Sequence, residues 1–185
     1  PLLERVEPVL APGDPIVVSR KPTGTLVLHD VLPGENLYLL ATGTGLAPFM
    51  SVIQDPETYE RFEKVILVHG VRYAGELAYT DFITRELPEN EFFGEEIRNR
   101  LIYYPTVTRE QFRNQGRLTE LVESGKLFED IGLPPFNPAI DRAMVCGSPA
   151  MLKDCCEMLN ARGFRISPHI GSPADYVIER AFVEK

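Results

Sequence analysis

The stretch Asn36–Ser51, which reads NLYLLATGTGLAPFMS, decides the fold of this chain. A short apolar run leads into the pentapeptide ATGTG at 41–45, and apolar residues at helical spacing follow it. This order predicts a strand, a tight turn and a helix. Such a turn directs backbone N–H groups and a helix N-terminus toward one point, which is a geometry that suits a phosphate. The stretch therefore favours a nucleotide ligand.

The glycine pattern leaves two interpretations open. Gly43 and Gly45 are two residues apart, but Pro48 stands where the G-x-G-x-x-G fingerprint needs its third glycine. The sequence has no G-K-[ST] either, which disfavours a P-loop nucleotide hydrolase. The same residues would fit an ordinary strand-to-helix turn in which the glycines serve geometry alone.

Composition narrows the classes of partner. The 185 residues are 44% hydrophobic and 25% charged, with a net charge of −8, which is typical of a globular protein and unfavourable for nucleic acid or an anionic membrane. We find no apolar run of transmembrane length and no signal peptide. The three cysteines cannot all pair and show no metal-ligand spacing. We therefore expect a reduced, cytoplasmic protein without a metal site.

Two regions of the chain differ in pattern. Residues 1–32 hold two short strand-like runs, at 16–18 and 25–28, and two such strands cannot form a core alone. We expect this region to be the C-terminal remnant of a β-domain, and the chain to be a fragment of a longer protein. In residues 33–185 strand and helix patterns alternate, which predicts an α/β domain with a parallel sheet covered on both faces. The predicted strands are 37–41, 65–69, 101–104, 143–146 and 176–182, and the predicted helices are 47–54, 81–87, 118–124 and 150–161.

Basic residues follow several of the predicted strands. In an open parallel sheet, ligands bind beyond the carboxyl ends of the strands, where Arg72, Arg109 and Arg117 would gather. A guanidinium is well matched to a phosphate monoester, whereas an NAD site favours an acidic residue after the second strand. Glu76 follows that strand too, but only after Arg72. We expect NADP rather than NAD, although any one of these arginines alone would be ordinary on a solvated surface.

The pair Cys146-Gly147 closes the fourth predicted strand. Cys146 is either a small apolar residue at the end of a buried strand or a group at the catalytic edge. No Lys, Arg or His adjoins it in the motif, which argues against a thiolate nucleophile. Gly147 would let a ligand approach the backbone. The apolar residues 181–183 suggest docking so near the end of the sequence, or packing on the domain's own edge.

Six motifs, taken together and in order, resemble the bacterial ferredoxin/flavodoxin–NADP(+) reductases. The resemblance extends from about residue 12 onward, and the ending AFVEK is typical of one bacterial group. It implies an N-terminal FAD-binding β-barrel, of which residues 1–32 match only the end, and an NADP-binding α/β domain, which residues 33–185 match. The motifs are ATGTGLAPFMS (41–51), HGVRYAGELAY (69–79), YYPTVTRE (103–110), GRLTELVESGKLFEDIGLPPFNP (116–138), DRAMVCGSPAML (141–152) and VIERAFVEK (177–185).

The resemblance also implies roles for particular residues. The turn Thr42–Leu46, with Gly43 and Gly45, would lie between flavin and nicotinamide, and Thr44 would lie near FAD. Arg72, Arg109 and Arg117 would hold the adenosine 2′-phosphate, and the pair 146–147 would stand beside the site of hydride transfer, where Cys146 would position the nicotinamide.

Two further roles concern the flavin. Ala181 would face the isoalloxazine ring, and Phe182 would support the FAD adenine. The family's barrel motif Arg-x-Tyr-Ser has no counterpart here, and Leu3 stands where a Ser or Thr usually meets the FAD pyrophosphate. We therefore expect most of the flavin site to lie outside this sequence.

The expected function is electron transfer between NADP(H) and ferredoxin or flavodoxin through FAD, with this chain supplying mainly the NADP-binding half. One alternative is the reductase component of an oxygenase or a flavohaemoglobin, which the lack of a ferredoxin-type cysteine cluster and of a globin segment disfavours. A second alternative is a non-catalytic NADP-binding module.

Overall fold

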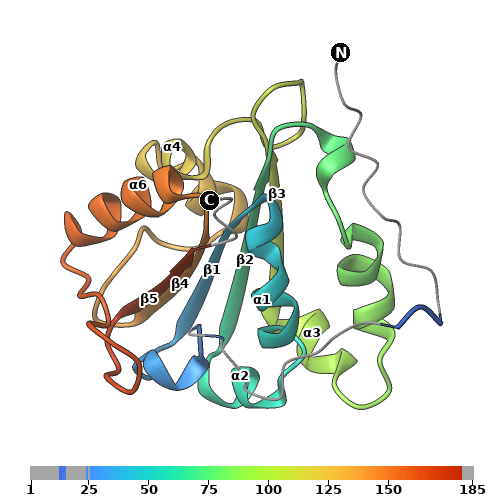
Figure 1. Cartoon of the computed structure of the whole chain (residues 1–185), viewed down its shortest axis with the longest axis horizontal. Helices are drawn as coiled ribbons and strands as arrows, with labels where there is room; N and C mark the ends of the chain where they lie inside the picture. Colours follow the sequence, from blue (N-terminus) through green and yellow to red (C-terminus); the bar gives the residue numbers. More distant parts are fainter. Residues whose placement is uncertain (1–12, 16–23, 25, 181–185) are drawn as a thin grey trace.

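A five-stranded parallel sheet forms the centre of the molecule (Figure 1). The computed structural model of the chain describes residues 13–15, 24 and 26–180. The predicted α/β class is confirmed, and all five predicted strands form, the last of them over its described residues. The strands are β1 (Asn36–Thr42), β2 (Lys64–Val71), β3 (Leu101–Val107), β4 (Asp141–Gly147) and β5 (Tyr176–Arg180).

The strand order β3-β2-β1-β4-β5 creates a switch point at the middle of the sheet. Within the sheet, the chain first forms β1 at the centre and then adds β2 and β3 on one side of it. It then returns to the other side of β1 to form β4 and β5. Between β1 and β4 the connections therefore leave in opposite directions, and the register places Ala41 beside Cys146 at this point. In open α/β sheets the crevice beyond such a switch point is where ligands bind.

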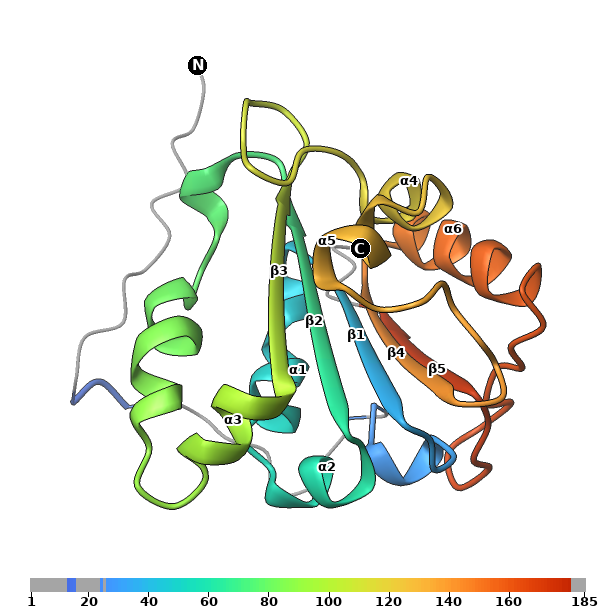
Figure 2. The same ribbon diagram turned by 180° about the vertical axis from the view of Figure 1, so that it is seen from behind.

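Helices cover both faces of the sheet, so the strands are apolar on both sides. Leu37 and Leu39 of β1 pack toward the first face, and Tyr38 and Leu40 pack toward the second. No helix in the described part of the chain is long and apolar enough to cross a membrane. The first face carries α1 (Leu46–Val52), α2 (Pro56–Arg61) and α3 (Gly94–Arg100), and the second, seen in Figure 2, carries α4 (Leu118–Glu123), α5 (Lys126–Ile131) and α6 (Pro149–Asn160).

Several elements differ from the sequence prediction. The segment predicted as an α-helix at 81–87 forms a π-helical turn, Phe82–Glu86, and then a 3-10 turn, Leu87–Glu89, where the proline at 88 has no N–H to continue a helix. Helices α2, α3 and α5 were not predicted, because each buries only two residues, which is too few to show a hydrophobic period, whereas α1 and α4 each bury three. They are stabilised by tertiary packing.

The N-terminal strand predictions have mixed outcomes. The run at 16–18 lies outside the described residues. The run at 25–28 is wrong over its described part, since a 3-10 helix, Leu28–Asp30, begins there. This segment buries Leu26, Leu28 and Val31 in the same core cluster as Leu37. It therefore packs against the first face of the sheet and does not pair with the sheet as a strand.

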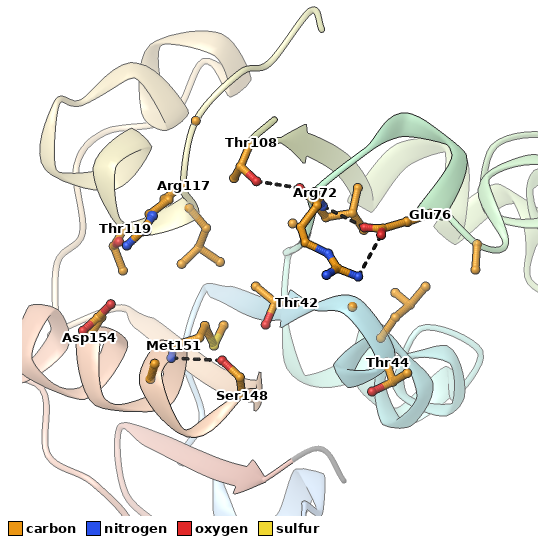
Figure 3. A pocket seen from close by; sticks show the side chains of 18 of the residues that line it. Thr42, Thr44, Arg72, Glu76, Thr108, Arg117, Thr119, Ser148, Met151 and Asp154 are labelled. Carbon is orange, nitrogen blue, oxygen red and sulfur yellow. Dashed lines mark hydrogen bonds and ion pairs between the residues drawn. The ribbon is translucent and has the colours of Figure 1, made fainter. Parts of the chain in front are cut away.

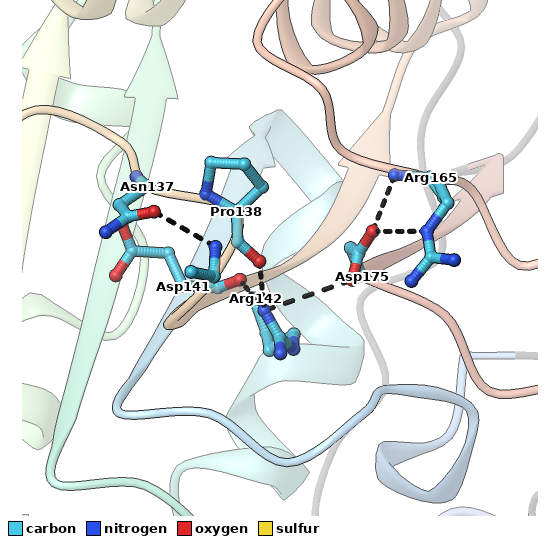
Figure 4. Close-up of polar contacts among 7 residues, drawn as sticks. Asn137, Pro138, Asp141, Arg142, Arg165 and Asp175 are labelled. Carbon is cyan, nitrogen blue, oxygen red and sulfur yellow. Dashed lines mark hydrogen bonds and ion pairs between the residues drawn. The ribbon is translucent and has the colours of Figure 1, made fainter.

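A buried polar cluster closes the sheet at the amino ends of β4 and β5 (Figure 4). Asp141, which is 2% exposed, accepts one hydrogen bond from the Asn36 side chain at 2.7 Å and one from the Asn137 backbone at 2.8 Å. Asp175 accepts bonds from the backbone and side chain of Arg165 at 2.9 and 3.1 Å. These carboxylates fix the loops at the edge opposite the switch-point crevice.

We predict that Asp141→Asn lowers the free energy of unfolding by about 2 kcal/mol, because one of its two contacts becomes a donor facing a donor. Urea denaturation followed by circular dichroism measures the loss. Asp81→Asn, at an exposed carboxylate paired only with Arg85, is the control and should change stability little. Equal effects from the two variants would contradict the role given to Asp141.

Candidate functional site

A cavity of about 890 Å³ opens beyond the carboxyl ends of the strands (Figure 3). Its walls come from the segments that follow β1, β2, β3 and β4, which are far apart in sequence. This volume lies within the range of small-molecule sites. The lining includes Thr42, Gly43, Thr44, Leu46, Gly70, Arg72, Glu76, Tyr79, Thr108, Gly116, Arg117, Thr119, Ser148, Met151 and Asp154.

The glycine turn forms the floor of this cavity, and it packs directly on the loop after β4. A Cβ at Gly45 would stand 2.6 Å from the Cys146 carbonyl carbon and 3.0 Å from the Gly147 nitrogen, so the two backbones touch. Gly147 is equally confined, because a Cβ there would meet the Thr42 hydroxyl and the Met151 sulfur. The predicted residues 42–45 and 146–147 are thus brought together. Gly43 adopts a left-handed φ of 53°, which glycine accepts at little cost.

Helix α6 begins at the same place. Ser148 is its N-cap and accepts a hydrogen bond from the Met151 backbone N–H at 3.3 Å, and Pro149 occupies the first turn. The serine and Met151 both line the cavity. The positive end of the α6 dipole therefore faces the ligand space, where an anionic group is stabilised.

The predicted arginines take different places around the cavity. Arg72 and Arg117 line it from separate walls, and Figure 3 shows them across the opening from each other. Arg109 is exposed and is not among the lining residues. Its backbone N–H nevertheless donates to the Arg72 carbonyl at 2.9 Å, so the two arginines are direct neighbours across the ends of β2 and β3.

Glu76 holds Arg72 in position. Its carboxylate accepts from the Arg72 backbone N–H at 2.9 Å, from the Arg72 guanidinium at 3.0 Å and from the Tyr73 N–H at 3.4 Å. These donors, led by the Arg72 backbone, keep the pKa of Glu76 below its ordinary value. The carboxylate therefore stays charged at neutral pH, and Arg72 is oriented before any ligand arrives.

Cys146 takes part in the site through its backbone, which contacts Gly45, and not through a reactive thiol. The residue is 2% exposed, and burial, helped by the charge of Glu179, raises the pKa of its thiol to about 11. The side chain is therefore a neutral thiol at pH 7 and a poor nucleophile. Its carbonyl instead supports Gly45. Ala181 and Phe182 lie outside the described residues.

The cavity includes residues that sequence reasoning missed. Tyr79, Thr108, Thr119, Ser148, Met151 and Asp154 all line it. Ser148 had a visible signal, because a serine before proline at the start of a helical pattern is typical of an N-cap. Thr108 also had one, since it comes just past the third predicted strand. The remaining four had none, since their place depends on how four loops meet. Within the described residues, no group of three or more His, Cys, Asp or Glu side chains could hold a metal ion.

The fold and this cavity define a class, the nucleotide-binding domains of oxidoreductases. The family described as "Oxidoreductase NAD-binding domain" matches residues 39–157 of the chain. That match covers β1 to most of α6, which includes every segment that lines the cavity.

Two curated relatives and one solved structure narrow the class. The ferredoxin–NADP reductases of Azotobacter vinelandii and Pseudomonas aeruginosa are each 67% identical over the whole chain, which spans 71% of their lengths. A ferredoxin NADP+ reductase from Neisseria gonorrhoeae, solved with bound FAD and NADP, aligns with a TM-score of 0.74 at 28% identity. That alignment covers 86% of this chain and 61% of the other. The chain belongs to the bacterial ferredoxin–NADP reductase family of flavin-dependent oxidoreductases, as its motifs predicted.

We predict that the two turn glycines respond differently to alanine. Gly45→Ala should lower the free energy of unfolding by about 2–3 kcal/mol, because the added methyl overlaps backbone that must move. Gly43→Ala, with no atom within 4 Å of the new methyl, should cost only about 1 kcal/mol from its left-handed φ. Urea denaturation of both variants checks the order, and a larger loss for Gly43→Ala would contradict the packing described.

Proposed function

We propose that this chain is the NADP(H)-binding part of a reductase that passes electrons between NADP(H) and ferredoxin or flavodoxin. One observation carries the proposal: a cavity of about 890 Å³ is lined by Arg72 and Arg117, and its floor is the glycine turn, which the Gly45–Cys146 backbone contact supports. In this proposal residues 33–185 are the NADP-binding domain, and residues 1–32 are the end of a flavin-binding barrel.

The arginine end would take the adenosine 2′-phosphate. Arg72 and Arg117 both line the cavity, and we place the phosphate where it would accept hydrogen bonds from the two guanidinium groups. Arg109 would add charge beside Arg72. Glu76 occupies one side of the Arg72 guanidinium and leaves its other donors for the ligand. These cations stand out in a chain of net charge −8 and would attract an anionic coenzyme.

The other end would take the nicotinamide. Gly45 packs on the Cys146 carbonyl and Gly147 packs against the Thr42 and Met151 side chains, whereas a Cβ at Gly43 would meet nothing within 4 Å. A flat ring could therefore approach the backbone closely at Gly43. The floor is fixed by the buried contact with Cys146, which would position the ring without attacking it. Exclusion of water by the buried strand ends would protect the hydride in transit.

The flavin would meet this end of the cavity. Thr44 stands at the rim, and the Neisseria relative holds both coenzymes in one structure. Bound FAD would supply the conversion between hydride chemistry and single-electron transfer. We assign Ala181 and Phe182 to its support. Strand β5 ends at Arg180, whose register partner Gly147 directly precedes the cavity-lining Ser148.

The arginine assignment predicts selective losses of affinity. Arg72→Ala or Arg117→Ala should each weaken NADP⁺ binding about tenfold or more, because a charge-assisted hydrogen bond contributes about 1.5–3 kcal/mol. Binding of NAD⁺, which lacks the 2′-phosphate, should change little. Isothermal titration calorimetry of the chain with both coenzymes measures the difference.

Arg85→Ala is the matched control for this experiment. Like Arg72, Arg85 is an exposed arginine paired with a carboxylate four residues away, but it does not line the cavity. Its loss should leave NADP⁺ affinity unchanged. Unaltered NADP⁺ affinity in both Arg72→Ala and Arg117→Ala would refute the proposed phosphate site.

A further inference from the structure

A buried histidine lies directly under the glycine turn, and the mechanism above does not use it. His69 is in β2, opposite Ala41 of β1, and is 1% exposed. Its Nε2 has no hydrogen-bond partner within the usual distance among the described residues. A polar nitrogen this deeply buried is costly unless the structure gains from its orientation.

The turn Gly43–Gly45 packs against β2, the strand that carries His69. Burial lowers the pKa of His69, while attraction to the Gly43 backbone opposes that shift. The imidazole is therefore neutral at pH 7, and its one proton is best placed on Nε2, toward the Gly43 carbonyl. Nδ1 is then an acceptor.

A chain of hydroxyls continues from Nδ1 to another wall of the cavity. The Tyr103 hydroxyl of β3 lies 3.3 Å from Nδ1 and 3.4 Å from the Thr80 hydroxyl. Thr80 also donates to the Leu77 carbonyl at 3.1 Å. With Nδ1 as the acceptor, the Tyr103 hydroxyl donates to it. The single Thr80 hydroxyl proton is then shared, in a bifurcated hydrogen bond, between the Leu77 carbonyl and the Tyr103 oxygen. The individual contacts are long, so each is weak, but they lie in succession.

The far end of this chain adjoins a strained residue. Tyr79 has a φ of 60°, which is the left-handed region that bulky residues avoid. Its ring is 61% exposed and lines both the main cavity and a neighbouring one of about 220 Å³. The Ile83 N–H holds the Tyr79 carbonyl at 2.9 Å. Strain of this kind persists only where neighbouring contacts determine it, and it is common at ligand sites.

We propose that His69 is a positioning residue that ties the Gly43 turn to the Tyr79 segment, through Tyr103 and Thr80, and so fixes the spacing of two cavity walls. This inference rests on the proposed coenzyme site for its functional consequence. Its structural content, a mechanical link between residues 43–45 and 79–80, does not depend on any ligand.

The test compares two adjacent tyrosines of β3. Tyr103→Phe removes only the hydroxyl that links His69 to Thr80, whereas Tyr104→Phe removes a hydroxyl on the opposite face that bonds Asp130 at 2.6 Å. Hydrogen exchange of the unliganded chain should speed up at 43–46 and 78–81 in Tyr103→Phe alone. NADP⁺ binding should weaken about threefold or more in that variant, and remain unchanged in Tyr104→Phe.

Histidine variants separate donor loss from loss of packing. His69→Gln can keep a donor near the Nε2 position, so it should retain more of the wild-type exchange protection at 43–46 than His69→Leu. Identical exchange in wild type and Tyr103→Phe, or equal loss in the Gln and Leu variants, would overturn the inference. Failure of the wild-type chain to bind NADP⁺ would instead refute the proposed coenzyme site, and the exchange result would still decide the role of His69.

Discussion

The close approach of two backbones, at Gly45 and at the Cys146–Gly147 peptide, is the constraint on which the site depends. It joins the end of β1 to the end of β4 across the switch point of the sheet. A side chain at Gly45 would overlap the Cys146 carbonyl and push these loops apart, and one at Gly147 would displace the Thr42 and Met151 side chains. The turn, the α6 N-terminus and the cavity floor therefore form one unit, whose position is set by the buried strands beneath it rather than by the loops themselves.

Charge is arranged around this unit with a clear asymmetry. The chain is acidic, yet Arg72 and Arg117 border the cavity and Arg109 adjoins Arg72. The carboxylate of Glu76 partly compensates the positive charge of Arg72 and also fixes that side chain in place. A preformed guanidinium loses less side-chain freedom on binding than a mobile one does, so part of the ordering cost is met in the folded protein.

The sequence predicted most of the sheet, because strands buried on both faces are continuous apolar runs such as Val65–Val68. It also predicted that Arg72, Arg109 and Arg117 would share an edge, since the carboxyl ends of parallel strands converge there. Arg72 and Arg117 line the cavity, and Arg109 adjoins Arg72 outside the lining. It did not predict α2, α3 or α5, which bury only two residues each and so show no period. Tyr79 and the link through His69 were invisible, because they depend on which loops touch after folding. A histidine inside a strand pattern carries no sign of the hydroxyl it will meet.

We propose that the crevice above the switch point binds a 2′-phosphorylated dinucleotide, with its phosphate at the arginines and its nicotinamide at the glycine turn. A crystal structure of the chain with NADP⁺ tests this most directly. We predict density for the 2′-phosphate between Arg72 and Arg117, and for the nicotinamide ring above Gly45 and Gly147. A well-ordered NADP⁺ whose 2′-phosphate contacts neither arginine, or whose nicotinamide lies away from the turn, would contradict the account.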